Sequence, residues 1–399
     1  MSRAGDWGRR AGAVGAAVGA VAAGAAVGLV AERVSVGRAA RGWPGRQPGH
    51  QPGAAPDELH WPEPGSPGGG RVQPVVASDG TRLHAEVHAE VHGEVHGRHD
   101  AAVTLVFSHG YCLSSLSWVF QRRDLADLGR AVFWDQRGHG RSAIGPPGNV
   151  GLDQLGRDLE AVLAACAPTG PLVLIGHSMG GMTIMSLAQQ RPELFADRVL
   201  GVGLLATSAG GLPETAFGLP RLAGELMHRT VPWAMTAYSR LPGFLSAARA
   251  MGSDFAQAMT RRWSYASPVS PGLVQFTAEM IGGTPPEVVG AFLPELTGHD
   301  TTAGLAELNR GVETLVLVGD HDLLTPVQHS EAITAAVHGA ELQVVPQAGH
   351  LVMLEHPEVV SAALRALVGR ALRATRSPRG GPARRSRPTG PARGSRWVR

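Results

Sequence analysis

The 399-residue chain contains no lysine, only two cysteines and few aromatic residues, which make up 5% of the total. Two cysteines cannot form a disulfide framework, and Cys112 and Cys166 lack the spacing of metal ligands, which excludes knottin-like and zinc-finger folds. Hydrophobic residues make up 43% of the chain, enough for a sizeable core, so a wholly disordered or fibrous protein is also excluded. The length fits two domains or one large α/β domain with insertions.

Charge is distributed unevenly along the chain. Residues 1–50 contain seven arginines and two acidic residues, and residues 371–399 contain nine arginines and no acidic residue. Because the net charge is +3, the intervening residues 51–370 carry a net charge of −11. The basic pI of about 9.4 therefore reflects the two ends, and we expect no nucleic-acid partner for the acidic body.

Residues 11–31 carry no charge and consist almost entirely of alanine, glycine and valine. As a helix this stretch would be about 30 Å long, close to the thickness of a bilayer core. We interpret residues 1–41 as an N-terminal membrane anchor or export signal, with small residues at 23–25 as a cleavage site; a disordered cytoplasmic arm is the third alternative. The corresponding localisation is membrane-associated or exported, with a cytoplasmic location left open.

Two further segments have the composition of disordered chain. Residues 42–71 are rich in proline and glycine and are interpreted as a linker. Residues 373–399 are interpreted as an arginine-rich disordered tail, with contact to anionic lipid or nucleic acid as the alternative.

Residues 84–96 repeat histidine at every fourth position. On a helix these histidines would share one face and suggest a metal site, but the segment alternates apolar and polar residues and follows a turn at residues 78–81. On a strand, residues four apart lie about 13 Å apart, too far to bind one ion. We therefore predict a β-hairpin arm with a local duplication and no metal site.

The body alternates short apolar runs with helical segments. The expected strands are residues 103–107, 131–134, 172–175, 199–205, 314–318 and 342–345, and helical periodicity covers residues 152–165, 182–190 and 331–337. This alternation predicts an α/β fold with a mostly parallel sheet and helices on both faces. Function in such sheets is found at the carboxyl ends of the strands, and polar or glycine-rich residues follow five of these six runs.

Ser178 stands in the pattern Gly176-His-Ser-Met-Gly180, which follows an expected strand and opens an expected helix. This context is typical of a nucleophile elbow, where side chains at both glycines would collide as the backbone doubles back. A serine nucleophile needs a base that is oriented by an acid. Asp322 and His350 follow in that order, each just after an expected strand.

Together these motifs resemble the α/β-hydrolase fold superfamily, in the lid-containing, esterase- and lipase-like branch with a serine nucleophile. The resemblance covers residues 72–370 and implies an eight-stranded, mostly parallel sheet. Its core would comprise residues 72–209 and 295–372, with a helical lid at residues 210–294. It further implies a triad and two oxyanion-hole amides, with no metal or organic cofactor, and it assigns these roles to Ser178, Asp322, His350, Tyr111 and Met179.

The remaining polar residues near the motifs are expected to be structural. By resemblance, residues 135–142 brace the loops under the site, and Asp320 is the rival to Asp322 as the acid. We interpret His109, Arg137, His139, Ser142 and His177 as supporting or packing residues. Cys112 lies near the oxyanion loop, but no base is expected beside it, which argues against a cysteine nucleophile. The lid carries Trp263, Tyr265 and other aromatic and methionine residues, interpreted as an acyl pocket or as the lid's own core.

The function that follows is a serine hydrolase that cleaves a small carboxylic ester with a hydrophobic acyl group through an acyl-enzyme. Two alternatives stay open: an acyltransferase or cofactor-free perhydrolase on the same triad, and a membrane-tethered binding module without turnover. The sequence leaves the oligomeric state open.

Overall fold

The structure is a computed structural model of the chain, and it describes residues 59–62, 66, 69–88, 103–212 and 253–376. The predictions for residues 1–41, for most of the linker and for residues 377–399 lie outside this part and stay predictions. No helix among the described residues combines the length and apolar character needed to cross a membrane.

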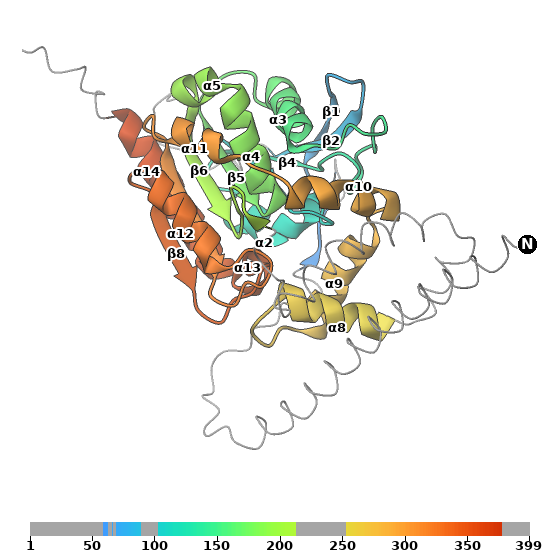
Figure 1. Cartoon of the computed structure of the whole chain (residues 1–399). Helices are drawn as coiled ribbons and strands as arrows, with labels where there is room; N and C mark the ends of the chain where they lie inside the picture. Colours follow the sequence, from blue (N-terminus) through green and yellow to red (C-terminus); the bar gives the residue numbers. More distant parts are fainter. Residues whose placement is uncertain (1–58, 63–65, 67–68, 89–102, 213–252, 377–399) are drawn as a thin grey trace, which may run out of the picture. The chain divides into compact units, whose positions relative to one another are not determined.

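An eight-stranded sheet forms the centre of the described chain (Figure 1). The order is β1-β2-β4-β3-β5-β6-β7-β8; β2 is antiparallel to both of its neighbours, and β3 to β8 are parallel. The strands are β1 (Arg71–Val76), β2 (Arg82–His88), β3 (Thr104–Ser108), β4 (Arg130–Trp134), β5 (Leu172–His177), β6 (Val199–Leu205), β7 (Glu313–Gly319) and β8 (Glu341–Val345). The predicted fold class is confirmed.

Each of the six runs expected to be strands is a strand, with ends that differ by at most two residues. The histidine-rich segment also begins as a strand: residues 82–88 form β2, after a turn in which Ala77 N–H donates to the Thr81 carbonyl at 2.8 Å. The predicted arm beyond residue 88 lies outside the described residues. Among those that are described, no group of three or more potential ligands is arranged to hold a metal ion.

Alternate residues of each central strand face opposite sides of the sheet, as the two-residue period of a strand requires. Val106 of β3 packs in one core cluster, and its neighbours Leu105 and Phe107 pack in the other. The first cluster is closed by α3 (Leu152–Cys166), α4 (Met179–Gln190), α5 (Pro192–Asp197), α11 (Thr302–Leu308) and α12 (Val327–Ala336). The second is closed by η2 (Ser115–Trp118), α2 (Val119–Asp124), α13 (Val352–Glu355) and α14 (Pro357–Arg376).

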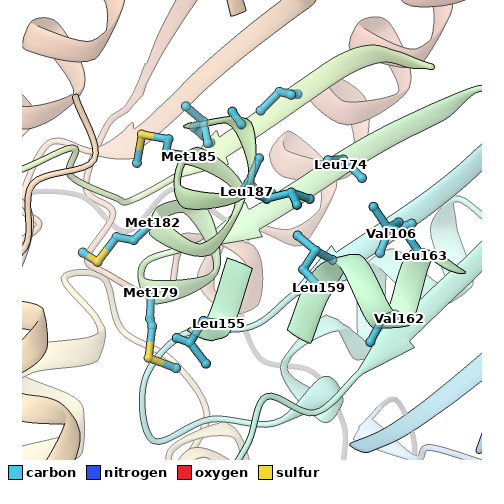
Figure 2. Packing of buried hydrophobic residues seen from close by; sticks show 14 of the residues in the cluster. Val106, Leu155, Leu159, Val162, Leu163, Leu174, Met179, Met182, Met185 and Leu187 are labelled. Atoms are coloured by element: carbon cyan, nitrogen blue, oxygen red, sulfur yellow. The ribbon is translucent and has the colours of Figure 1, made fainter. Parts of the chain in front are cut away.

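Helix α4 packs against α3 and against the sheet, in the first cluster (Figure 2). Figure 2 shows Met179, Met182 and Met185 along one side of α4, with Leu187 on the other. All four side chains are buried. Because α4 begins next to Ser178, this packing holds the start of the helix in place.

Residues 213–252 of the expected lid lie outside the described residues. The part that is described contains three helices before α11: α8 (Ser253–Ser264), α9 (Pro271–Gly282) and α10 (Pro286–Thr297). We call them the cap. Ser270 caps α9 by accepting from Leu273 N–H at 3.2 Å, and Pro271 opens the helix. Helix α10 runs to Thr297, three residues beyond the expected lid boundary at Pro294.

Two expected boundaries differ from the structure. Trp61, in the expected linker, is buried and donates from Nε1 to the Glu86 carboxylate at 3.0 Å, because a tryptophan buries a large apolar ring and still needs a hydrogen-bond acceptor. Strand β1 already begins at Arg71, and α14 continues to Arg376, four residues into the expected tail.

Candidate active site

Ser178 occupies a tight turn between β5 and α4. Its backbone has φ 51° and ψ −119°, a left-handed conformation that is rare outside glycine. A Cβ on Gly176 would lie 2.5 Å from backbone atoms of Gly180 and Gly181, and one on Gly180 would lie 2.1 Å from the Ser108 carbonyl oxygen. Strand and helix thus approach too closely for side chains at either glycine, as the elbow interpretation requires.

The loop after β3 lies against this turn. A Cβ on Gly110 would lie 2.6 Å from His177 Nδ1 and 3.2 Å from the Cβ of Ser178, so only glycine permits this approach. In the described part of the chain, the backbone amides of Tyr111 and Met179 donate to no acceptor. Met179 is the first residue of α4, where free amides and the helix dipole favour negative charge.

The Tyr111 side chain connects the same loop to the cap. Its hydroxyl donates to the Val289 carbonyl oxygen in α10 at 2.5 Å. Burial raises the pKa of Tyr111, so the hydroxyl keeps its proton and remains a donor. Helix α10 also packs on the loop after β4, where the His139 and Phe292 rings lie 5.5 Å apart.

Asp322 and His350 form a buried pair at the ends of β7 and β8. His350 Nδ1 lies 2.9 Å from Asp322 Oδ2, and the carboxylate also accepts from Leu324 N–H, Thr325 N–H and the Thr325 hydroxyl. Burial alone would raise the pKa of Asp322, but His350 and the Thr325 donors outweigh it and hold the pKa below its ordinary value of 3.8. The ionised carboxylate fixes the proton on Nδ1 and leaves Nε2 free to accept one.

Asp320, the rival acid, has different partners. Its Oδ1 lies 2.6 Å from His321 Nδ1 and 3.3 Å from Ala348 N, and no contact joins it to His350 among the described residues. The geometry therefore pairs His350 with Asp322.

His177 connects the loop that carries His350 to the turn that carries Ser178. Its Nε2 donates to the His350 carbonyl oxygen at 2.9 Å, and the two ring centroids are 4.8 Å apart. Burial lowers the pKa of His177 to about 3, so the ring is neutral. In the described residues no hydrogen bond joins Ser178 Oγ to His350, although both side chains lie at the same edge of the sheet.

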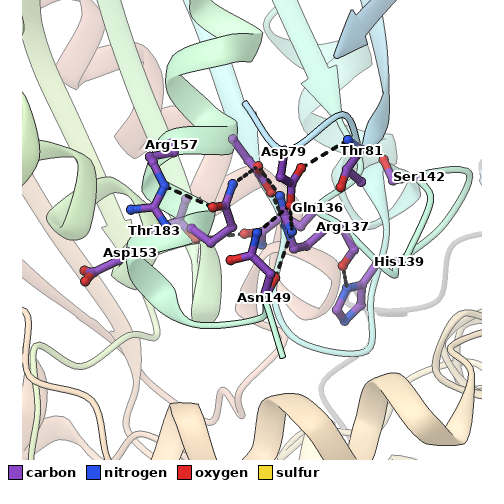
Figure 3. A network of polar contacts seen from close by, with 12 residues as sticks. Asp79, Thr81, Gln136, Arg137, His139, Ser142, Asn149, Asp153, Arg157 and Thr183 are labelled. Carbon is purple, nitrogen blue, oxygen red and sulfur yellow. Dashed lines mark hydrogen bonds and ion pairs between the residues drawn. The ribbon is translucent and has the colours of Figure 1, made fainter. Parts of the chain in front are cut away.

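Residues 135–142 brace the loops beneath this edge (Figure 3). The fully buried Arg137 guanidinium makes two 2.6 Å hydrogen bonds to Asp158 and one of 2.8 Å to Asp79. Asp135 accepts from Ser115 N–H at 2.7 Å and from Arg141 N–H at 2.9 Å. The structure thus supports the bracing interpretation, with a bidentate buried pair at its centre.

His109 and Gln136 extend the brace to α4. His109 Nε2 accepts from Gln136 N–H at 2.9 Å, Gln136 Nε2 donates to the His109 carbonyl at 2.6 Å, and the Thr183 hydroxyl of α4 donates to Gln136 Oε1 at 2.7 Å. Burial lowers the pKa of His109, as expected for a structural ring. The loop after β3 and α4 are therefore held by one buried network.

Cys112 does not have the surroundings of a nucleophile. The side chain is buried, and burial raises the pKa of the thiol to about 12, so it stays protonated at neutral pH. Tyr265, one of the lid aromatics, forms a 2.5 Å hydrogen bond with Thr277 Oγ1, and its ring packs in the second core cluster together with Leu273 and Val274 of α9.

Sequence reasoning missed Glu355. Its buried carboxylate accepts hydrogen bonds from the backbone of the His350 loop, at Gly349, and from the backbone of the cap, at Ala266 and Ser267. Two of its three donors lie 88 and 89 residues away in sequence, so no local pattern could have identified it.

The arrangement of the sheet, the turn at Ser178 and the Asp322–His350 pair can be compared with known proteins. A sequence profile of the α/β-hydrolase family matches residues 105–363, well over half of the chain. The chain belongs to this family. Its relatives and structural neighbours include hydrolases and esterases, together with acetyltransferase components and a bromoperoxidase, and the chain is an enzyme of the α/β-hydrolase type.

Individual relatives are distant but cover most of the described residues. A candidate carbamate hydrolase, RutD, of Caulobacter segnis is 27% identical over 263 residues, covering 65% of this chain and 89% of that protein. The sn-1-specific diacylglycerol lipase ABHD11 of Mus musculus is 26% identical over 256 residues, covering 64% and 77%. A malate-bound esterase from Thermogutta terrifontis superposes with a TM-score of 0.59 at 26% identity, covering 75% of this chain and 99% of that one.

Proposed function

We propose that the protein is a serine hydrolase that cleaves a small carboxylic ester through an acyl-enzyme on Ser178. The observation that carries the proposal is the chain of contacts from Asp322 through His350 to His177, the residue directly before Ser178. A buried carboxylate, an imidazole and a serine on a strained turn at one sheet edge are what acyl transfer requires.

In the proposed mechanism each group has one task. His350 Nε2 takes the proton from Ser178 Oγ as the oxygen attacks the ester carbonyl, and later delivers it to the leaving alcohol. Asp322 holds the imidazole tautomer and stabilises the imidazolium. The amides of Tyr111 and Met179 stabilise the tetrahedral oxyanion, and losing one such donor costs about 10²–10³ in rate. Water then takes the acyl group.

The mechanism requires Ser178 Oγ and His350 Nε2 to reach hydrogen-bond distance in the substrate complex. Such bonds are often long without substrate and tighten when it binds. The proposal includes a hydrophobic acyl group because the segment expected to form the lid is rich in aromatic and methionine residues.

The test is intact mass after treatment with a fluorophosphonate probe, together with hydrolysis of esters of increasing acyl length. We expect one adduct on the wild type, none on Ser178→Ala, and a loss of ester turnover by several orders of magnitude in that variant. Ester turnover retained by Ser178→Ala would refute the proposal. Product analysis with an alcohol competing against water measures whether hydrolysis or acyl transfer dominates; we expect hydrolysis.

Ser208 provides a matched control. It also follows a strand at this edge of the sheet, and its Oγ lies 3.0 Å from the Nδ1 of a histidine, His329. Unlike Ser178, it does not open a helix at an elbow. We expect Ser208→Ala to keep both the adduct and the turnover; loss of the adduct in this variant alone would move the nucleophile to Ser208.

A further inference from the structure

Three hydrogen bonds hold the backbone at and next to His350, and their partners are Glu355, Ser264 and His177. Gly349 N–H, directly before it, donates to Glu355 Oε2 at 2.6 Å. Leu351 N–H, directly after it, donates to the Ser264 carbonyl at the end of α8, at 3.0 Å. The His350 carbonyl accepts from His177. The position of the imidazole therefore depends on these contacts as well as on Asp322.

Glu355 joins this loop to the cap. Its Oε1 accepts from Ala266 N–H at 2.8 Å and from Ser267 N–H at 2.5 Å, in the turn between α8 and α9, and its Oε2 accepts from Gly349. The side chain is 4% exposed. Among the described residues, three backbone N–H donors and no acceptor face this side chain. A carboxylate presents acceptor oxygens to all three, whereas the NH₂ group of an amide would face a donor.

The cap turn and the loop also touch directly. A Cβ on Gly349 would lie 2.7 Å from the Ser264 carbonyl oxygen and 2.9 Å from the Cα of Tyr265. Residue 349 therefore has to be glycine for the two backbones to come within reach of one carboxylate. The same turn is anchored in the cap by Tyr265, whose hydroxyl lies 2.5 Å from Thr277 Oγ1 in α9.

We propose that Glu355 is a positioning residue for His350, through which the α8–α9 turn of the cap sets the place of the general base. This rests on the proposed function. The carboxylate does not touch the reacting atoms; it holds the two peptide segments whose separation decides where the imidazole sits relative to Ser178. A displacement of about 1 Å at such a group costs on the order of 10²-fold in rate.

The experiment compares Glu355→Gln with Glu86→Gln in the full-length protein. Glu86 is also a buried carboxylate that accepts hydrogen bonds, from Trp61 and Arg141, and within the described part of the chain it forms no hydrogen bond with the cap or with the loop of His350. We expect Glu355→Gln to lower kcat by about 10- to 100-fold with KM changed less than about twofold, because the binding surface is kept and the base is misplaced. Glu86→Gln should keep kcat within about twofold.

A second readout follows the base itself. The low-field proton NMR signal of His350 Nδ1–H, identified by its loss in Asp322→Asn, should shift in Glu355→Gln and stay in place in Glu86→Gln. Equal kcat values and an unshifted signal in the two variants would overturn the proposal.

Two further results keep the test decisive. If Glu355→Gln does not fold, Glu355→Asp replaces it, since it keeps the charge with a shorter reach; we expect a smaller fall in kcat, and wild-type kcat would refute the proposal. Labelling of the wild type at Ser178 separates the two ideas: a wild type without the adduct defeats the proposed function, and a labelled wild type with an indifferent Glu355→Gln defeats only this inference.

Discussion

At Gly180, helix α4 lies so close to the backbone of β3 that any side chain would push the helix, and with it Ser178, away from the sheet. A methyl group there would lie 2.1 Å from the Ser108 carbonyl oxygen, 2.6 Å from its carbon and 2.8 Å from the His109 carbonyl oxygen. The shortest contact is about 1.3 Å below the ordinary 3.4 Å. Because all three atoms belong to the backbone of β3 and the loop after it, no side chain can rotate away, and α4 has to move.

We expect Gly180→Ala to cost about 1–3 kcal/mol of stability, typical of overpacking, and to lower kcat/KM by about 10²-fold or more, as for a displacement of roughly 1 Å at a nucleophile. Thermal unfolding followed by circular dichroism measures the first effect, and steady-state ester hydrolysis measures the second. Fluorophosphonate labelling should slow by a similar factor.

Gly282→Ala is the matched control, because the new methyl group at the exposed end of α9 meets no atom within 4 Å. It should leave turnover unchanged. If Gly180→Ala hydrolyses esters within about threefold of this control, the close approach of α4 to β3 does not determine the geometry at Ser178, and the steric reasoning is wrong.

Three further predictions follow. Asp322→Asn should lower kcat by about 10³–10⁴-fold. Because the pKa of Asp322 in the folded protein lies below 3.8, the ionised carboxylate stabilises the fold above that pH, and this stabilisation is lost as the pH falls through the folded-state pKa. The Tm difference between wild type and Asp322→Asn should therefore be widest above pH 5 and shrink toward pH 3. Tyr111→Phe deletes the hydrogen bond from the loop after β3 to the Val289 carbonyl of α10 and should lower kcat about tenfold. The control Thr297→Val, which deletes a hydroxyl bonded only to carbonyls of α10 itself, should not lower it; equal effects would refute a link between the cap and the loop after β3. A chain without residues 1–41 should leave the membrane fraction with its turnover intact, and identical fractionation of both chains would contradict the anchor.

Local chemistry made part of the site predictable. The turn at Ser178 can be recognised in the sequence because the backbone reverses direction there and leaves no room for side chains at Gly176 and Gly180. Both glycines lie within two residues of Ser178. The resemblance already favoured Asp322 over Asp320 as the acid. The structure adds the contact itself: the two carboxylates are two residues apart, and only that of Asp322 lies within hydrogen-bond distance of His350.

Other contributions had no local signal. Trp61 lies in a proline- and glycine-rich segment, and nothing nearby indicates that its ring is buried or that Glu86, 25 residues on, accepts its N–H. The sequence supports only a packing role for His177, and its hydrogen bond to the His350 carbonyl, 173 residues away, is visible only in the structure. Sequence patterns report periodicity and turn chemistry over about ten residues, and these contacts are beyond that range.

The sequence by itself determined the alternation of strands and helices, the strained turn that exposes Ser178 and the presence of an acid and a histidine behind later strands, because backbone sterics and side-chain periodicity act between neighbours. Only the tertiary structure decided which acid meets His350, how Tyr111 reaches the cap and why Glu355 is buried. Those outcomes depend on strand order and on the docking of the cap, which bring residues 28 to 178 positions apart to within hydrogen-bond distance.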